Sequence, residues 1–316
     1  MNGSDFRVYA GKRVLLTGHT GFKGGWLATW LTRLGADVTG YSLPPSTSPN
    51  LFHAAGIASR VRSIEGDVRD RDHLARVWRD TRPDVVFHLA AQADVGTSME
   101  RPSFDAEVNV VGTVNALEAA RAAGAHLVFS STGGAIYGSV EEPAREDSAL
   151  LPVSAYGLAK RSAEVYLDGW NRIFDTHHVT LRFANVYGPR QSAALEGGVV
   201  AIFLERLTAG EPTTIFGDGT ITRDFVHVDD VVRALLLAAE HDGGVFNVGT
   251  GVETTVSDLH ALCERAVGVD APPSYGPARA GDALRSVLDT TKSSAELGFT
   301  AAVALAEGIA ATAAAT

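Results

Sequence analysis

The chain has 316 residues, of which 45% are hydrophobic and 20% charged, and these values are ordinary for a globular protein with a large core. Its formal net charge of -10 argues against nucleic acid as a partner, because binding to phosphate backbones needs a basic surface. The single cysteine, Cys263, excludes an internal disulfide and a cysteine metal cluster, and no signal peptide or membrane-spanning run is visible, so we expect a cytoplasmic protein without a metal site or membrane anchor.

The first half of the chain alternates short apolar runs with longer amphipathic ones. Strands that are almost continuously apolar and alternate with helices are typical of a parallel sheet covered on both faces. The sequence therefore predicts an α/β fold with a doubly wound parallel sheet. The predicted strands are 12–18, 36–42, 61–67, 84–91 and 126–132, and the predicted helices are 22–35, 70–80 and 103–123.

The second half begins with one more helix and strand, at 154–175 and 179–188, and then changes in character. Glycine, proline and short irregular segments interrupt the later helices. We predict a first domain over 1–185, with a returning segment near 224–250, and a smaller second domain that comprises most of 186–316. The alanine-rich end of the chain favours a helix.

A glycine-rich segment, TGHTGFKGGWL, follows the first predicted strand and opens the first predicted helix. Its glycines, Gly18, Gly21 and Gly24, are spaced more widely than in the GxGxxG pattern. Glycines allow tight turns and close approach of backbone amides to a pyrophosphate, and the helix N-terminus adds partial positive charge. The position of the segment favours a dinucleotide site over a purely structural turn.

The end of the second predicted strand lacks the acidic residue that holds the adenosine ribose of NAD in many such sites. Tyr41 and Ser42 stand there instead, in GYSLPP, and no arginine is present to bind a 2'-phosphate. This segment alone does not decide between NAD and NADP. Asp67 and Val68, after the third strand, are expected to border the adenine.

Tyr156 and Lys160, in SAYGLAKRSAE, lie four residues apart and therefore on one face of the predicted helix. A neighbouring ammonium favours a phenolate over a phenol, so Tyr156 becomes a general base that works closer to neutral pH. The same lysine is able to hydrogen-bond a ribose. An amphipathic helix explains the spacing equally well, but the glycine loop upstream favours the catalytic interpretation.

These motifs, together with HLAA at 88–91, resemble the extended short-chain dehydrogenase/reductase family that remodels nucleotide sugars. HLAAQADV, NVVGTVNALEAAR, FSSTGGAIYG, RFANVYGPRQ and IFGDGTITRDFVHVDD are similar to segments of UDP-glucose 4-epimerases. The resemblance covers nearly the whole chain. It implies a Rossmann-type sheet with a smaller C-terminal α/β substrate domain, NAD as cofactor, a nucleotide-diphosphate sugar (most often a UDP-sugar) as substrate, and a homodimer formed by helices 103–123 and 154–175.

The resemblance also implies site residues. Asn185 and Arg223 match family positions that hold the diphosphate, and Arg279 with Asp282 match positions that hold the nucleotide ribose. The implied cofactor-binding residues are Gly18, Thr20, Gly21, Phe22, Lys23, Gly24, Ser42, Asp67, Val68, Leu89, Ala90, Ala91, Asn109, Ser130, Tyr156 and Lys160. The implied substrate-binding residues are Gln92, Thr132, Tyr156, Asn185, Arg223, Arg279 and Asp282.

Two features complicate the choice of reaction. The opening loop is similar to that of CDP-glucose 4,6-dehydratases, but dehydratases of this family carry an acidic residue just after the catalytic Ser or Thr, and this chain has Gly133, Gly134 and Ala135 there. Gly133 also occupies the usual Ser or Thr position, so Thr132 or Ser131 replaces it, with Thr132 preferred. A structural role for both as strand-end caps stays open.

The sequence therefore predicts an NAD-dependent nucleotide-sugar 4-epimerase that acts on a UDP-hexose, with Tyr156, Lys160 and Thr132 as catalytic residues. A 4,6-dehydratase and a non-catalytic dinucleotide sensor are the alternatives. Ser286, four residues after Asp282, is small, and the resemblance implies that a small residue there leaves room for an N-acetyl group. Glucose, N-acetylhexosamine and glucuronate substrates all stay open.

Overall fold

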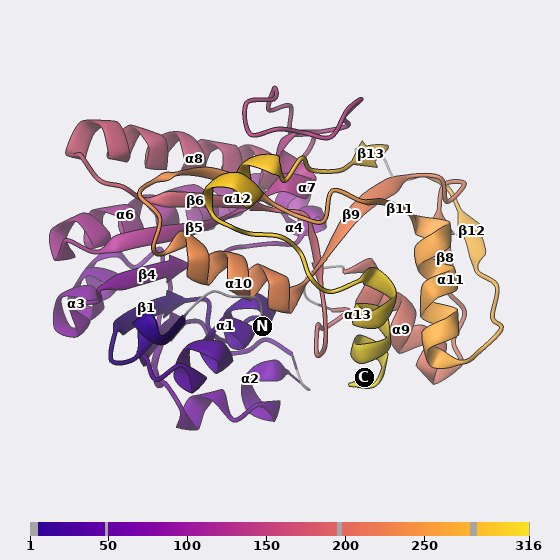
Figure 1. Ribbon diagram of the computed structural model, residues 1–316, viewed down its shortest axis with the longest axis horizontal. Coiled ribbons are helices and arrows are strands. Elements are labelled where there is room, and N and C mark those ends of the chain that lie inside the picture. Colours follow the sequence, from indigo (N-terminus) through magenta and orange to yellow (C-terminus); the bar gives the residue numbers. More distant parts are fainter. Residues whose placement is uncertain (1–5, 48–49, 195–197, 279–282, 316) are drawn as a thin grey trace.

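A seven-stranded, fully parallel sheet forms the centre of the computed structural model, which describes residues 6–47, 50–194, 198–278 and 283–315 (Figure 1). Its strand order is β10-β6-β5-β4-β1-β2-β3, and the order reverses between β1 and β4. The predicted doubly wound parallel sheet is therefore confirmed. The strands are β1 (Arg13–Thr17), β2 (Asp37–Ser42), β3 (Arg62–Glu65), β4 (Val85–His88), β5 (His126–Thr132), β6 (Val179–Phe183) and β10 (Gly244–Val248).

Helices cover both faces of this sheet, because successive buried residues of one strand enter different cores. In β1, Leu16 packs with α1 (Phe22–Arg33) and α10 (Val228–Ala238). Leu15, its neighbour, packs on the opposite face with a second set of helices. Those helices are α3 (Arg71–Thr81), α6 (Gly112–Ala123) and α8 (Ala155–Phe174).

A smaller region with its own apolar core lies beside the sheet, on the right in Figure 1. One sheet has the order β11-β9-β13 with β7 paired to β9, and β12 pairs with β8. The division into domains at residue 185 stays a prediction. The elements of this region are β7 (Asn185–Tyr187), α9 (Val199–Ala209), β8 (Thr214–Phe216), β9 (Thr222–His227), β11 (Glu253–Thr255), α11 (Val256–Val267), β12 (Ser274–Gly276), β13 (Arg285–Ser286) and α13 (Leu305–Ala313).

Several elements differ from the sequence prediction in detail. The predicted strand 179–188 is interrupted at Ala184, and its two parts join different sheets. Across the described residues, no helix combines the length and apolar character that crossing a membrane requires. The remaining short elements are η1 (Phe6–Tyr9), α2 (Leu51–Ala54), η2 (Ile57–Ser59), α4 (Val95–Glu100), α5 (Pro102–Ala106), the π-helical η3 (Glu107–Val111), α7 (Gly133–Ile136) and α12 (Thr291–Glu296).

Candidate active site

The glycine loop lies where the strand order reverses, against the segment that follows β4. Thr17 Oγ1 accepts hydrogen bonds from the backbone N of Leu89 and of Ala90, each at 3.2 Å. Gly18 has a φ of 79°, and a Cβ there would lie 2.8 Å from the Ala90 nitrogen. A Cβ on Gly24 would overlap the carbonyl oxygen of Gly18. The loop is therefore packed against its neighbours at positions where only glycine fits.

The start of α1 has the character of an anion site. Gly21 caps this 12-residue helix, and its first turn contains Lys23 and no acidic residue. Backbone N–H groups and the partial positive charge of the helix point out of this end. The glycine contacts and the basic first turn together fit the pyrophosphate of a dinucleotide.

Hydroxyl groups and a buried imidazole line the carboxyl end of β2. Thr20 Oγ1 and Ser42 Oγ are 2.8 Å apart, and Thr20 Oγ1 donates to the carbonyl oxygen of Leu43 at 2.9 Å. The His19 ring lies over Gly40, and its Nε2 is 2.7 Å from Ser63 Oγ. Burial lowers the pKa of His19 to about 4, so the ring is neutral at pH 7.

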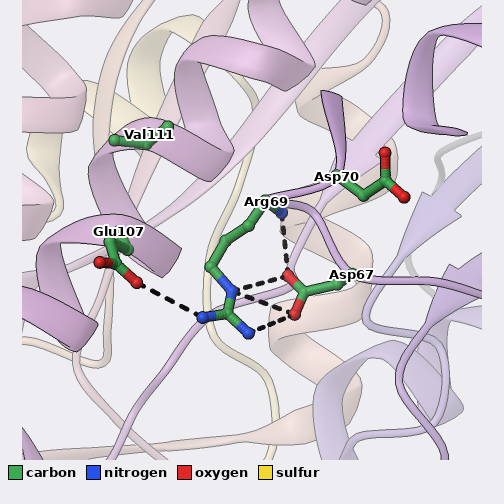
Figure 2. Close-up of a pocket in the computed structure, with 5 residues that line it drawn as sticks. All are labelled: Asp67, Arg69, Asp70, Glu107 and Val111. Atoms are coloured by element: carbon green, nitrogen blue, oxygen red, sulfur yellow. Dashed lines mark hydrogen bonds and ion pairs between the residues drawn. The ribbon is translucent and has the colours of Figure 1, made fainter. Parts of the chain in front are cut away.

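The carboxylate of Asp67 is already paired with a cation. Figure 2 shows Arg69 donating to both Asp67 oxygens, with the shortest distance 2.6 Å, and reaching Glu107 at 3.4 Å. The Arg69 guanidinium lowers the pKa of Asp67. Asp67, Arg69 and Glu107 line an open hollow of about 520 Å³. At the predicted adenine border, Asp67 thus presents a neutralised ion pair, and Val68 is buried beside it.

Gln92 and Asn109 hold each other in place after β4. Asn109 Nδ2 donates to the Gln92 carbonyl oxygen and to Asp105 Oδ1, each at 2.9 Å. Gln92 Nε2 also donates to Asp105 Oδ1, at 2.9 Å. Burial raises the pKa of Asp105. The amide groups of these two predicted ligand-binding residues are therefore engaged in fixing the loop that follows Ala91.

Lys160 is buried, with an exposed fraction of 3%, and its ammonium points at the end of β5. Nζ donates to the Ser130 carbonyl oxygen at 2.9 Å and lies 4.8 Å from the centre of the Phe129 ring. Burial, with a smaller effect of Lys23, lowers the pKa of Lys160 to about 7. Tyr156 is one turn earlier on α8 and half-buried, and its backbone N donates to Ser98 Oγ at 3.1 Å.

Ser131 and Thr132 use their hydroxyl groups differently. Ser131 Oγ donates to Glu164 Oε1 at 2.5 Å, so its only proton is engaged by a carboxylate. Thr132 Oγ1 instead accepts from the backbone N of Ala135 at 3.2 Å and caps α7. Because that contact uses a lone pair, the Thr132 hydroxyl keeps a proton to donate to a ligand. The capping role that the sequence left open is therefore present at Thr132.

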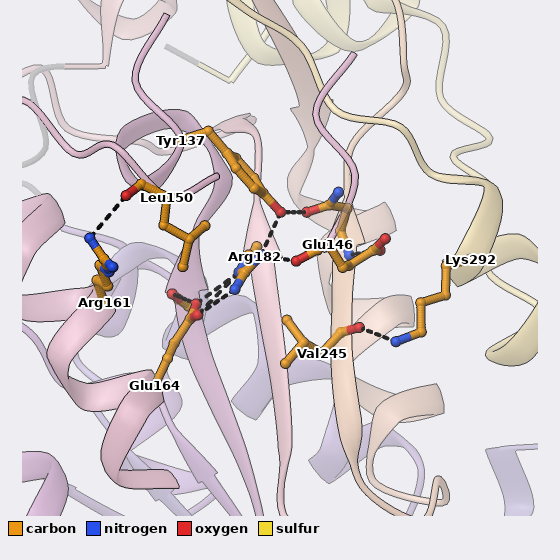
Figure 3. A network of polar contacts seen from close by, with 10 residues as sticks. Tyr137, Glu146, Leu150, Arg161, Glu164, Arg182, Val245 and Lys292 are labelled. Carbon is orange, nitrogen blue, oxygen red and sulfur yellow. Dashed lines mark hydrogen bonds and ion pairs between the residues drawn. The ribbon is translucent and has the colours of Figure 1, made fainter. Parts of the chain in front are cut away.

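A buried ion pair between Glu164 and Arg182 supports this end of the sheet and was missed from the sequence (Figure 3). Arg182 Nη2 lies 2.7 Å from Glu164 Oε2, and Nη1 donates to Tyr137 Oη at 2.7 Å. Tyr137 Oη in turn donates to Asn247 Oδ1 at 2.8 Å. Two signals were available: a glutamate four residues after Lys160, and an arginine inside the strand VTLRF.

The structure describes two of the residues predicted to bind the nucleotide diphosphate, Asn185 and Arg223. Asn185, on β7, lies beside the segment that follows Thr132, because a Cβ on Gly134 would be 3.2 Å from its Oδ1. Arg223, on β9, donates to the Ala283 carbonyl oxygen at 2.7 Å and is in register with the buried Ser286 of β13. Arg279 and Asp282 lie outside the described residues.

Comparisons with known proteins match nearly the whole chain. A model of the NAD dependent epimerase/dehydratase family matches residues 14–249. The UDP-glucose 4-epimerase of Mycolicibacterium smegmatis is 45% identical over 304 residues, which are 95% of this chain and 97% of that protein. A UDP-glucose 4-epimerase structure from Thermotoga maritima with UDP-glucose has a TM-score of 0.91 and 42% identity, over 96% of this chain and 97% of that one. One from Thermus thermophilus with NAD has a TM-score of 0.89 and 39% identity, over 96% and 98%.

Proposed function

We propose that the protein, which belongs to the NAD dependent epimerase/dehydratase family, is a UDP-hexose 4-epimerase, an isomerase that uses bound NAD. The family resemblance drawn from the motifs is confirmed by the family model and by the identity to a UDP-glucose 4-epimerase. UDP-glucose and its 4-epimer UDP-galactose are the proposed substrate pair, because all three relatives described above are UDP-glucose 4-epimerases.

The observation that carries the proposal is the hydrogen bond by which Lys160 contacts the end of β5. Its ammonium donates to the Ser130 carbonyl oxygen, two residues before Thr132, and Tyr156 precedes it by one turn of α8. We propose that the Tyr156 phenol, the Lys160 ammonium and the Thr132 hydroxyl act together at the carboxyl ends of the parallel strands, where ligands bind in folds of this class. This set suits proton transfer at one sugar hydroxyl.

The 4,6-dehydratase alternative is disfavoured by the space around α7. Elimination of water needs acid and base groups beyond the tyrosine, and the positions after Thr132 are Gly133 and Gly134. A Cβ on Gly133 would lie 2.6 Å from Leu288 Cδ1, so a larger side chain there would have to displace the buried Leu288 side chain. The site therefore favours a reaction confined to C4.

Proton transfer is assigned to Tyr156. Its phenolate, stabilised by the nearby Lys160 ammonium, takes the proton from the sugar 4-hydroxyl and returns it at the end of the cycle. Thr132 donates its hydroxyl proton to the same sugar oxygen and holds it near the phenol. Asn185 and Arg223 are proposed to hold the diphosphate, which leaves the sugar free to turn over between the two half-reactions.

The cofactor is proposed to lie along the loop at Gly18–Gly24, with its pyrophosphate on the first turn of α1. Lys160 is proposed to hold the nicotinamide ribose, and Ser42 to lie beside the adenosine ribose. When bound, NAD supplies a hydride acceptor and then a hydride donor at the sugar C4, so the reaction has no net redox change. The protein's contribution is to orient the sugar and to exclude water.

Product analysis by NMR tests the activity. The purified protein is incubated separately with UDP-galactose, UDP-N-acetylglucosamine, UDP-glucuronate and CDP-glucose. We expect conversion of UDP-galactose to UDP-glucose. A 4-keto-6-deoxy product would establish a dehydratase, and no product from any sugar would favour the sensor.

Tyr156→Phe tests the assigned base. We expect a loss of turnover of about a hundredfold or more, the usual contribution of general acid–base catalysis, with the cofactor still bound. Cofactor content is read from the ultraviolet spectrum. Retained turnover in Tyr156→Phe would refute the assignment.

A homodimer is proposed through the outer face of α8, at the upper left of Figure 1. Leu158, Val165, Tyr166 and Ile173 are exposed by 45% to 70% and lie on one stripe of this helix. Gly169 lies on the same stripe, and a Cβ there would meet no atom within 4 Å. An apolar stripe of this kind on a surface helix suits a self-complementary two-fold interface.

Sedimentation velocity tests the dimer with a matched pair of variants. Val165→Glu, at a residue 63% exposed, is expected to give monomers, because a charge would be buried in the interface. Val252→Glu, at a residue 62% exposed in the smaller region, is expected to stay dimeric. A monomeric wild type would overturn this proposal.

A further inference from the structure

We infer that Glu65, at the end of β3, supplies the carboxylate that binds the adenosine ribose and selects NAD over NADP. In many dinucleotide sites this carboxylate ends the second strand, where this chain has Ser42. The inference rests on the proposed use of NAD. It assigns the binding of the adenosine ribose to a carboxylate on β3, the strand next to β2.

The hydroxyl protons at the end of β2 are already engaged within the protein. Thr20 donates its proton to the carbonyl oxygen of Leu43, so the proton in the contact between Thr20 and Ser42 comes from Ser42. Ser42 Oγ then offers only lone pairs to a ligand. A ribose diol presents two O–H donors, whereas a 2'-phosphate presents oxygens that need donors. This arrangement accepts the diol and gives a 2'-phosphate no partner.

Other nearby carboxylates are engaged. Asp67 is paired with Arg69 through both of its oxygens, as Figure 2 shows. Asp70 caps α3, with its Oδ1 accepting from the backbone N of His73 at 3.0 Å. Glu65 is exposed, and its side chain makes no hydrogen bond or ion pair with the rest of the described chain. It is therefore the carboxylate that is ready to accept from a ligand.

Glu65 lies on the face of the sheet that the glycine loop covers. In the parallel ladder, Ser42 pairs with Glu65 and Gly40 pairs with Ser63, so the side chains of Ser42, Ser63 and Glu65 point to one face. The His19 ring lies over Gly40 and touches Ser63, which places the loop on that same face. We call the group His19, Thr20, Ser42, Ser63 and Glu65 the cofactor edge.

The sign of the charge then decides between the two cofactors. A carboxylate accepts a strong hydrogen bond from a ribose hydroxyl but repels a 2'-phosphate dianion. Arg69, a cation near this edge, is paired with Asp67 and Glu107. The cofactor edge therefore carries net negative character toward the 2'-position.

Binding measurements on the full-length chain test Glu65 without reference to turnover. The nucleotide carried by the purified protein is released and quantified by chromatography, and thermal unfolding is followed at increasing NAD or NADP. In Glu65→Gln, the NAD concentration that gives half-maximal binding should rise about tenfold, as expected for loss of a hydrogen bond to a charged group. NADP binding should not weaken. Glu65→Arg should favour NADP.

Asp37→Asn is the matched control, because Asp37 is an exposed carboxylate at the opposite end of β2. It should bind NAD as the wild type does. The inference is overturned if Glu65→Gln keeps wild-type affinity for NAD, if it weakens NAD and NADP equally, or if Asp37→Asn shows the same loss. A wild type that binds NAD through Glu65 but converts no sugar would overturn the proposed function and leave this inference standing.

Discussion

Polar groups are held at strand ends both in the cofactor edge and at the end of β5 around Ser131 and Thr132, which we call the catalytic end. The contacts that hold them differ in kind. Apart from Glu65, the cofactor edge consists of neutral hydroxyls and a neutral imidazole that contact one another, as Thr20 contacts Ser42. At the catalytic end, a buried ion pair between α8 and β6 fixes the Ser131 hydroxyl. The internal contacts of the cofactor edge are local and join neutral groups, whereas those of the catalytic end join separate elements and include a charged pair.

This difference explains how the sequence of the opening loop can vary independently of the catalytic end. His19 of the opening loop and Gly40 of β2 fit each other, because the His19 ring fills the space that a side chain at position 40 would need. Such a change is compensated within a few residues and leaves the distant proton-transfer groups untouched. Changes around Glu164 have no comparable local compensation, because its partners lie on β5 and β6.

The largest expected effect comes from breaking the charged arrangement. Glu164→Ala leaves the Arg182 guanidinium buried without its carboxylate, which should lower the free energy of unfolding by about 3–5 kcal/mol. Urea denaturation measures this change. Asp168→Ala is the control, since it removes an exposed ion pair with Arg172 on the same helix and should cost less than about 1 kcal/mol. Equal effects of the two variants would contradict the contrast between the two regions.

Lowering the pH should destabilise the fold through His19, the buried neutral imidazole of the cofactor edge. The unfolded His19 side chain has a pKa near its ordinary 6.5, and burial lowers the folded value to about 4. Its contribution to stability is therefore complete above pH 6.5 and is lost as the pH falls toward 4, by about 3 kcal/mol in total. Urea denaturation of wild type and His19→Phe across this range isolates the effect. Parallel pH profiles of the two proteins would contradict it.

Much of the fold was predictable because the pattern was local. Strands such as β4 are mostly apolar, with Val85, Val86 and Phe87 buried on both faces, and they alternate with amphipathic helices. The break at Ala184 was not predictable, because Asn185–Tyr187 is as strand-like as Val179–Phe183 and joins β9 only in the folded chain. The π-helical segment Glu107–Val111 was not predictable either. Its residue Asn109 donates to the Gln92 carbonyl oxygen, a contact that forms only in the folded chain.

In the candidate site, too, local patterns were predictable and contacts between distant residues were not. Tyr156 and Lys160 were found because four-residue spacing on a helix is visible in the sequence, and the glycine loop because it follows a strand. The pairing of Glu164 with Arg182 joins a helix to a strand, and no periodicity reports such a contact. The hydroxyl roles of Ser131 and Thr132 depended on which one faced Glu164, which the sequence left open.

A smaller effect should follow from disturbing the match between His19 and Gly40. A Cβ on Gly40 would lie 2.6 Å from His19 Nδ1 and closer still to two ring carbons, so Gly40→Ala should cost about 1–3 kcal/mol of unfolding free energy. In a His19→Ala background the same substitution should cost much less, because the overlapping ring is absent. A double-mutant cycle by urea denaturation measures the coupling. Additive effects would show that the two positions are independent.

The smallest expected effect separates positioning from stability at the catalytic end. Ser131→Ala removes the hydroxyl that ties β5 to Glu164 but leaves the ion pair with Arg182 intact, so the fold should persist while Thr132 loses its fixed position. Turnover of UDP-galactose should fall about tenfold with KM unchanged, because a small misplacement acts on the reacting geometry. Ser131→Thr keeps the hydroxyl and should restore turnover, and Ser162→Ala, on an exposed part of α8, should not alter it. If Ser131→Thr is as slow as Ser131→Ala, the hydroxyl is not what positions Thr132, and the charged arrangement serves stability alone.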